Sequence, residues 1–322
     1  MVSRLKLVLG VADHDLNRAL IDGAVCPSDM ELQVVWDLED GQRHGRMLHD
    51  GAFDACEFSF ANYLLLRSQG APFRGIPVFP NRKFRHSYVF CNRRAAIRQP
   101  RDLEGKRVGM RGWANTASLW VRGILQRFYG LDLSRVAWFA SPESFRIDLP
   151  KGVVLERLAA DQDLDAMLVA GELDAVIYPD VLPSIQRGAP EVCRLFDDYR
   201  AAEQEFYRQT RIFPISHLVI IKEEVVRAYP WVPASLLELF RQARDACFGR
   251  LENQQLLSLS WAGALLAEQR ALMGPHYWPY NVADNRLVLD TLIAFAHEQG
   301  LIPQPLPLEE LFVPDTLTAP GA

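Results

Sequence analysis

The sequence has little of what marks several common protein classes. Its 322 residues include only five cysteines and no CxxC pair, so neither a disulfide framework nor a thiolate zinc site is expected. No run of about 18 uncharged apolar residues occurs, which excludes a membrane-spanning helix. Basic side chains number 35 and acidic ones 40, and this balance does not favour nucleic acid or an anionic membrane as a partner.

A secretory signal is also missing. Met1 leads directly into an alternating run, Arg4-Leu5-Lys6-Leu7-Val8-Leu9-Gly10, which predicts a first strand and lacks the apolar core and small-residue cleavage site of a signal peptide. We therefore expect a cytoplasmic protein. The length and the 49% hydrophobic content are typical of a globular chain with two lobes, and its partner is expected to be a small molecule.

Strand and helix patterns alternate along the chain. The first third predicts strands at 5–10, 31–37 and 55–59, with a helix at 45–50 before the third strand. A new unit is expected after Gln99-Pro100, and the sequence from residue 223 onward predicts mainly helices. This alternation indicates an α/β protein with mostly parallel sheets.

The segment from Pro77 to Ser87 is the most informative part of the sequence. It places Arg82, Lys83, Arg85 and His86 in a strand-like, otherwise apolar stretch. Charged groups are costly to bury without neutralisation, so the cluster predicts either a solvated edge or a cleft for an anionic ligand. We expect Arg82 and Arg85 to hold a ligand carboxylate, because guanidinium groups bind carboxylates bidentately.

A second anion site is suggested by the turn before a predicted helix at 117–129. Trp113-Ala114-Asn115-Thr116 follows Gly112, and a glycine-containing turn that opens a helix presents free backbone N–H groups. An ordinary capped helix explains the same residues equally well.

Several segments together resemble one family of proteins, the 4,5-dihydroxyphthalate decarboxylases, within the type 2 periplasmic-binding-protein-like fold. The resemblance covers nearly the whole chain. Its matching pieces are Glu57-Phe58-Ser59-Phe60-Ala61, Ile76-Pro77-Val78-Phe79-Pro80 with Arg82, Phe84 and Arg85-His86-Ser87, Gly105-Lys106-Arg107-Val108-Gly109, Trp113-Ala114-Asn115-Thr116, Gly171-Glu172-Leu173-Asp174-Ala175, Phe213-Pro214-Ile215 with His217, Pro230-Trp231-Val232, Trp278-Pro279-Tyr280, and Ala296-His297-Glu298-Gln299-Gly300.

The resemblance implies a two-lobed α/β fold with the ligand cleft between the lobes. Lobe one would comprise residues 1–93 and 213–322, and lobe two residues 94–212. The implied activity is the non-oxidative decarboxylation of a hydroxylated aromatic carboxylate, 4,5-dihydroxyphthalate to protocatechuate or a close analogue. One turn differs from the family pattern: Pro179-Asp180-Val181-Leu182-Pro183-Ser184 has no arginine, which leaves a monocarboxylate or a differently substituted ring open.

Two other classes of protein remain as alternatives. Most proteins of this fold bind a small anion without chemistry, and this chain could do the same with an aromatic carboxylate. A sugar- or pyrimidine-related synthase on the same fold is the third alternative, although no segment rich in cysteine or histidine favours it. A homo-oligomer is compatible with the aromatic-rich region from Trp261 to Trp278.

The decarboxylation requires a base, an acid and an anchor. Glu57 or Asp13 is expected to accept the phenolic proton, and His86 or His217 to deliver a proton to carbon, since histidine suits proton transfer near neutral pH. Further residues are expected to contact the substrate: His14, Ser59, Arg82, Arg85, Trp113, Asn115, Thr116, Tyr178 and Asp180.

No cofactor is required by this scheme, because the hydroxylated ring itself accepts the electrons. The carboxylates and histidines at Asp13, His14, Glu57, His86, His217 and Asp180 could nevertheless assemble a divalent-metal site that chelates neighbouring hydroxyls. No HExxH-like spacing supports one. The expectation is therefore an enzyme without bound metal. The other histidines, His44, His49, His276 and His297, are expected to be structural.

Overall fold

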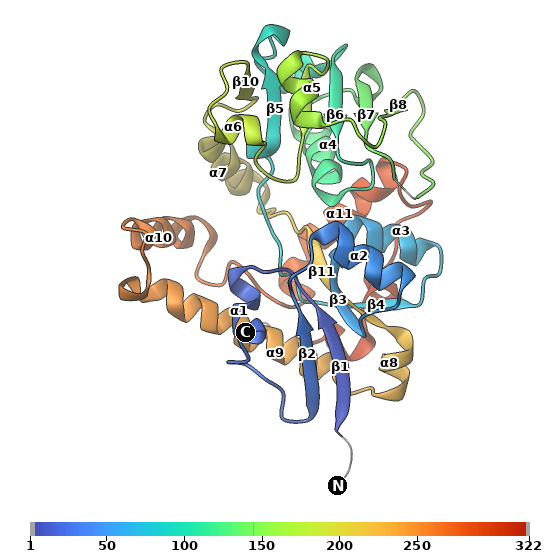
Figure 1. The fold of residues 1–322 in the computed structure, drawn as a ribbon, viewed down its shortest axis with the longest axis vertical. Helices are drawn as coiled ribbons and strands as arrows, with labels where there is room; N and C mark the ends of the chain where they lie inside the picture. Colours follow the sequence, from blue (N-terminus) through green and yellow to red (C-terminus); the bar gives the residue numbers. More distant parts are fainter. Residues whose placement is uncertain (1–3, 144, 320–322) are drawn as a thin grey trace. The chain divides into compact units, whose positions relative to one another are not determined.

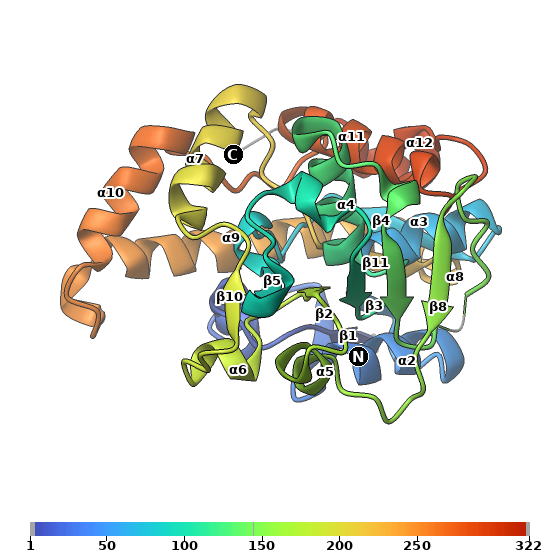
Figure 2. The same cartoon turned by 90° about the horizontal axis from the view of Figure 1, so that it is seen from above.

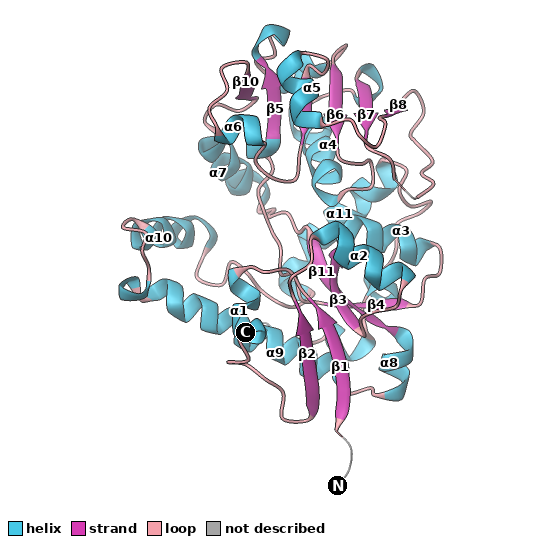
Figure 3. Cartoon of the chain, in the orientation of Figure 1, coloured by secondary structure: helices cyan, strands magenta, loops and turns pink. Residues whose placement is uncertain are grey.

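The computed structural model describes residues 4–143 and 145–319. They divide into two compact units. Unit 1 comprises residues 4–82, 217–287 and 306–319, and unit 2 comprises residues 83–216 and 288–305. These bounds differ from the expected lobes, 1–93 with 213–322 and 94–212, chiefly because residues 288–305 belong to unit 2. Helices and strands alternate in both units (Figure 3).

Unit 1 is built on a five-stranded mixed sheet in the order β2-β1-β3-β11-β4. β1, β2 and β3 run parallel, whereas β11 is antiparallel to both of its neighbours. All five residues of β3 are buried, as expected for a strand covered on both faces. The strands are β1 Leu5–Gly10, β2 Met30–Val35, β3 Ala55–Ser59, β4 Phe73–Ile76 and β11 His217–Lys222.

Short helices and one long helix surround this sheet. They are α1 Arg18–Ile21, α2 Asp40–His49, α3 Phe60–Ser68, α8 Glu223–Ala228, α9 Val232–Glu252, α10 Ala262–Met273, α12 Leu308–Leu311 and α13 Pro314–Leu317. Figures 1 and 2 show α10 turning back from the end of α9. No residue of α10 is buried, and the preceding Trp261 is 74% exposed. The homo-oligomer stays a prediction.

The start of α2 was predicted wrongly. The helix begins at Asp40 rather than at Gly45. Two glycines, Gly41 and Gly45, fall within its first six residues, and each glycine lowers helix propensity by about 1 kcal/mol relative to alanine. Its buried residues Arg43 and Met47 are four positions apart, and this contact face stabilises the helix despite the glycines.

Unit 2 contains a six-stranded sheet in the order β10-β5-β9-β6-β7-β8. Its strands are β5 Val89–Asn92, β6 Arg107–Met110, β7 Ala137–Ala140, β8 Val154–Arg157, β9 Ala175–Ile177 and β10 Val192–Arg194. Its helices are α4 Thr116–Tyr129, α5 Leu164–Ala170, α6 Pro183–Gln186 and α7 Tyr199–Thr210, and most of α11 Arg286–Glu298 belongs to the same unit. Phe90, Leu168, Leu173 and Val176 lie at the centre of its core.

The helix α11 belongs to unit 2 for a visible packing reason. Gly123 of α4 faces the ring of Phe295 so closely that a Cβ at position 123 would lie 2.2 Å from that ring. The side chain of Gln299, just after α11, accepts a hydrogen bond from Arg122 and donates one to the carbonyl of Leu119. No pattern in the sequence predicts that these distant residues pack together.

No helix of the described residues is long and apolar enough to cross a membrane. The segment around Arg85 was expected to be strand-like, but it is irregular: the chain has no strand between Ile76 and Val89, and His86–Tyr88 forms a single 3-10 turn.

Candidate active site

A buried carboxylate, Glu57, lies at the centre of a polar group in unit 1. Its side chain is fully buried in β3. In the antiparallel pairing of β3 with β11, Ser59 lies opposite His217 and Glu57 lies opposite Val219. Because side chains two apart on a strand share a face, Glu57 and His217 project from the same side of the sheet.

Each oxygen of Glu57 has its own partners. Oε2 accepts hydrogen bonds from the backbone N–H of Ala12 and from Nδ2 of Asn17, both at 3.0 Å. His14 Nε2 lies 3.5 Å from the same oxygen. Oε1 lies 2.8 Å from His217 Nδ1. The carboxylate therefore joins two histidines that are 203 positions apart in the sequence.

Glu57 is ionised in this environment. Burial alone would raise the pKa of its carboxyl, but the charge of His14, hydrogen bonds from His14 and His217, and the charge of Arg43 hold that pKa well below its usual value. A buried carboxylate that accepts several hydrogen bonds is stabilised in its charged form. Because its oxygens are occupied, Glu57 does not match the expected role of a base that receives the phenolic proton directly.

His14 is the counterpart of this charge. Its side chain is 23% exposed, so one side of the ring reaches solvent. Burial lowers the pKa of His14, but the neighbouring Glu57 carboxylate outweighs that effect and the net pKa is raised above 6.5. Asn17 also donates from Nδ2 to the carbonyl of Ala12 at 3.0 Å, which fixes the turn that carries His14.

Helix α2 contributes a second set of side chains beside His217. Asp40 Oδ2 lies 3.8 Å from His217 Nε2, and the ring of His44 meets the ring of His217 edge-on with centroids 5.5 Å apart. Arg43 donates from Nη2 to Asp40 Oδ1 at 2.6 Å and from Nε to the carbonyl of Glu57 at 3.2 Å. Burial, followed by the charges of His217 and Arg43, lowers the pKa of His44 to about 3.

The sequence identified part of this group. Glu57, His14 and His217 were all expected in the site, and the structure brings them together. Asn17, Asp40, Arg43 and His44 were missed. The only available signal was the spacing of Asp40 and His44, which lie on one face of a helix at i and i+4, and it was hidden because α2 was predicted to begin at Gly45.

Two residues that were expected in the site, Asp13 and Ser59, make other contacts. Asp13 forms an exposed ion pair with Arg18, with 2.9 Å between Oδ1 and Nη1, and it makes no contact with Glu57 in the described residues. It is therefore a poor base for the substrate. Ser59 caps α3, where its hydroxyl accepts a hydrogen bond from the N–H of Asn62 at 3.5 Å.

His86 belongs to unit 2 and does not have the surroundings of a proton donor. Its ring is packed among Tyr129, Phe196 and Phe206 with centroids 5.0–5.7 Å away. Neither ring nitrogen has a hydrogen-bond partner among the described residues. Burial lowers the pKa of His86 to about 4, so the imidazole is neutral at pH 7, and the prediction that it delivers a proton is not supported by this geometry.

Arg85 is a buried cation of unit 2 whose contacts are all neutral. Its guanidinium donates to the hydroxyl of Ser216 and to the carbonyl of Pro179, and no carboxylate of the described residues lies within ion-pair distance. Burial lowers the pKa of Arg85 to about 10, so it is still charged at neutral pH. A buried positive charge of this kind is suited to an anionic ligand.

Arg82, the other expected anchor, is held inside unit 1. It donates from Nη2 to the carbonyl of Pro279 at 3.1 Å and to the amide oxygen of Asn285, and its guanidinium lies over the rings of Phe79 and Trp278. Two hydrogen bonds and two ring faces therefore hold its guanidinium in place. Arg82 is therefore a weaker anchor than Arg85.

The turn before α4 binds a carboxylate of the protein itself. Glu143 accepts hydrogen bonds from the N–H groups of Trp113 at 2.7 Å and Ala114 at 2.8 Å. The indole of Trp113 is fully buried and donates to the carbonyl of Gln299, so it does not form the expected aromatic wall. Asn115 caps the helix by accepting from the N–H of Ser118, and Thr116 is its buried first residue.

The last two expected contacts lie after β9. Tyr178 packs against the core of unit 2. Asp180 is exposed, with Oδ1 4.0 Å from Lys83 Nζ. Neither is brought to a buried polar group by the described residues of its own unit, and their roles toward a substrate stay predictions.

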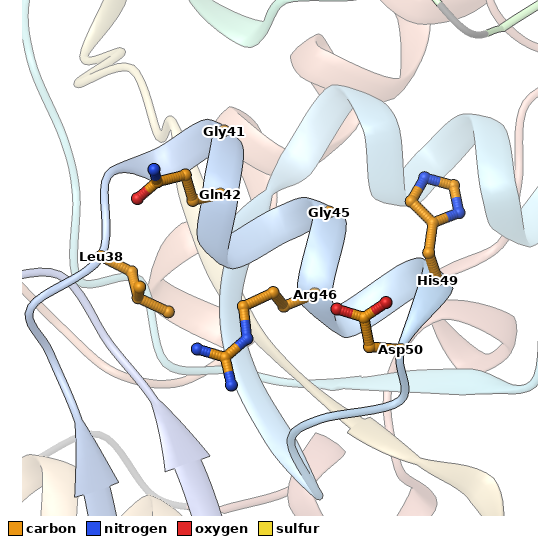
Figure 4. A pocket seen from close by; sticks show the side chains of 7 residues that line it. All are labelled: Leu38, Gly41, Gln42, Gly45, Arg46, His49 and Asp50. Carbon is orange, nitrogen blue, oxygen red and sulfur yellow. The ribbon is translucent and has the colours of Figure 1, made fainter.

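A hollow of about 420 Å³ lies along α2 (Figure 4). It is lined by Leu38, Gly41, Gln42, Gly45, Arg46, His49 and Asp50. One face of the helix, by its 3.6-residue period, carries Gly41, Gln42, Gly45, Arg46 and His49, and the opposite face carries Asp40, Arg43, His44 and Met47. The hollow is therefore separate from the Glu57 group and contains none of its residues.

The chain is similar to two decarboxylases in sequence. It is 33% identical over 327 residues to a 4,5-dihydroxyphthalate decarboxylase of Comamonas testosteroni, which covers 98% of each chain. It is 31% identical over 217 residues to a 4,5-dihydroxyphthalate decarboxylase of Pseudomonas putida, which covers 65% of this chain and 83% of the relative. No protein-family model matches the chain.

Solved structures show the fold. The periplasmic aliphatic sulphonate binding protein SsuA of Escherichia coli matches with a TM-score of 0.59 at 17% identity, over 98% of this chain and 99% of that one. The desulfurization enzyme DSZB matches with a TM-score of 0.56 at 14% identity, over 97% of each chain. The fold is therefore the expected periplasmic-binding-protein-like fold. Solved proteins with this fold include both binding proteins and an enzyme.

Proposed function

Because the chain belongs to the 4,5-dihydroxyphthalate decarboxylase family, we propose that it converts 4,5-dihydroxyphthalate to 3,4-dihydroxybenzoate (protocatechuate) and carbon dioxide. The structural observation that supports this most is the ionised, fully buried Glu57 between His14 and His217. Buried carboxylates that orient and charge imidazoles are typical of proton-transfer sites. Fold likeness alone would not separate an enzyme from a binding protein.

The proposed reaction proceeds through protonation of the ring carbon that bears the departing carboxylate. The hydroxyl para to the departing carboxylate loses its proton, and its electron pair moves through the ring to the carbon that bears the carboxylate. That carbon takes a proton, the bond to the carboxylate breaks, and the electrons of this bond restore the aromatic ring. The phenolate then regains a proton, so the net reaction consumes one proton and releases one carbon dioxide.

His14 is the group best suited to protonate the ring carbon. Its raised pKa keeps it protonated at higher pH than an ordinary histidine, and its partial exposure leaves an edge for a substrate. Glu57 acts through it as a positioning residue, by holding the charge and orientation of the imidazole. His217, on the other oxygen of Glu57, and its neighbours Asp40 and His44 are the groups left to activate the phenol.

Arg85 is the proposed binding group for a substrate carboxylate in unit 2. We expect Arg85→Ala to raise KM for 4,5-dihydroxyphthalate by at least about 10-fold, because a charge-assisted hydrogen bond contributes about 1.5–3 kcal/mol. Steady-state kinetics measure the change, with the exposed Arg111→Ala as the control. An unchanged KM would remove Arg85 from the binding site.

The function itself is tested by incubating the purified chain with 4,5-dihydroxyphthalate and measuring carbon dioxide. Unsubstituted phthalate is the control substrate, since a ring without hydroxyls cannot accept the electrons in this way. Release from the first and none from the second is expected. Tight binding of 4,5-dihydroxyphthalate without any release would instead identify a binding protein for aromatic carboxylates. The cytoplasmic location stays a prediction.

A further inference from the structure

We propose that Asp40, His44 and His217 bind one divalent transition-metal ion in unit 1. One ligand atom from each residue lies within 4.8 Å of the others. Around a tetrahedral zinc ion, ligand atoms at about 2.0–2.1 Å from the metal are separated by about 3.4 Å. Side-chain rotations that move each ligand by about an ångström are therefore sufficient to complete the site.

His44, expected from the sequence to be structural, is the ligand with the clearest evidence of a missing partner. His44 Nε2 is buried and has no hydrogen-bond partner among the described residues. Buried polar side-chain atoms nearly always have a partner, so each exception requires an explanation. A metal ion held beside His217 would supply one, because an unprotonated imidazole nitrogen is a common metal ligand.

The other two ligands are oriented by contacts that leave one atom of each available. His217 Nδ1 is held by Glu57 at 2.8 Å, which leaves Nε2 on the side of Asp40. This is the carboxylate–histidine–metal arrangement found around many zinc ions. Arg43 holds Asp40 Oδ1 at 2.6 Å and leaves Oδ2, the oxygen nearest His217, for the ion.

The ligand set and the exposure define the class of ion. Two imidazoles and one carboxylate favour zinc, cobalt, iron or manganese over magnesium and calcium, which prefer oxygen ligands alone. The Asp40 side chain is 48% exposed, so the ion can enter from solvent. Three protein ligands leave at least one coordination position for a substrate atom.

The catalytic use of this ion rests on the proposed function. A divalent ion can accept the two adjacent hydroxyl oxygens of 4,5-dihydroxyphthalate and lower the pKa of the phenol that must lose its proton. His217 then serves as a ligand, and His14 remains the proton donor on the other oxygen of Glu57. This role differs from the expected scheme, in which no metal was required and His217 was a candidate acid.

Zinc binding tests the site without relying on activity. The untagged full-length chain is stripped with chelator, dialysed and titrated with zinc chloride in a calorimeter, and cobalt(II) absorption reports the coordination. We expect one ion per chain, a binding constant reduced at least about 100-fold in His44→Ala, and a clear loss of affinity in Asp40→Asn. His49→Ala, an exposed histidine of the same helix, and Cys26→Ser, an exposed thiol, are matched controls that should bind normally.

Two results would overturn the metal site. One is the absence of zinc binding by the wild-type chain, and the other is equal affinity in His44→Ala, Asp40→Asn and the His49→Ala control. If His44→Ala does not fold, Asp40→Asn decides the question, because that side chain is 48% exposed and asparagine keeps the Oδ1 acceptor that Arg43 binds.

Carbon dioxide release measured on the same samples separates this inference from the proposed function. Zinc binding with the expected variant pattern, but no decarboxylation of 4,5-dihydroxyphthalate, supports the site and contradicts the function. Full decarboxylation by a chain that binds no zinc supports the function and overturns the site.

Discussion

Glu57→Gln is expected to lower kcat for decarboxylation by about 10³-fold while the chain remains folded. The amide has nearly the same shape as the carboxylate, so the change removes charge rather than volume. Without the charge, burial dominates at His14 and its pKa falls, so the imidazolium that would protonate the ring carbon is no longer favoured. Proton transfer by a positioned side chain contributes about 10²–10⁴ to a rate.

Initial rates of carbon dioxide release give the kcat of Glu57→Gln, and circular dichroism checks the fold. Glu224→Gln is the matched control, because Glu224 is a 71% exposed carboxylate of the same unit. It should retain full activity. A Glu57→Gln enzyme with near wild-type kcat would show that the central carboxylate has no part in the chemistry.

His14→Ala is expected to lower kcat by at least about 100-fold and to change the pH dependence of the remaining activity. In the proposed mechanism the protonated form of His14 donates the proton, and the pKa of His14 is raised above 6.5. Activity should therefore be highest below that pKa and fall as the pH rises through it. In the variant this descending limb should disappear, and added imidazole should restore part of the rate.

The pH–rate profile distinguishes a proton donor from a residue that only supports the fold. His49→Ala is again the control, since it removes an exposed imidazole outside the Glu57 group. If His14→Ala keeps the descending limb of the wild type at a uniformly reduced rate, another group carries the proton and the role assigned to His14 is wrong.

The fold was predictable because strand and helix patterns are local in the sequence and because the resemblance to a known family covers nearly the whole chain. Alternating strands and helices indicated an α/β chain with mostly parallel sheets. The parallel strands are β2, β1 and β3 in unit 1 and β9, β6, β7 and β8 in unit 2, and the remaining strand pairs are antiparallel. The return of residues 288–305 to unit 2 was not predictable in the same way. It depends on the contact of Gly123 with Phe295, which joins residues 172 positions apart and leaves no periodic pattern in the sequence.

The site residues that lie on strands or directly after them were predictable. Glu57 and His217 lie on paired strands, and His14 follows a third strand of the same sheet. Their side chains therefore meet at one edge of that sheet. The contributions of Asp40 and His44 depend on a helix that begins five residues earlier than expected. Arg85 and His86 are neighbours in the sequence and both are buried. The structure distinguishes them by their contacts, because Arg85 donates hydrogen bonds to Ser216 and Pro179 whereas the ring of His86 is enclosed by aromatic rings.

The proposed decarboxylation is tested by the reaction of wild-type protein with 4,5-dihydroxyphthalate in D₂O, followed by ¹H NMR and by carbon dioxide release. We expect one carbon dioxide per molecule of 3,4-dihydroxybenzoate, with one deuterium on the ring carbon that lost its carboxylate. Unchanged substrate, or a product that retains both carboxylates, would contradict it.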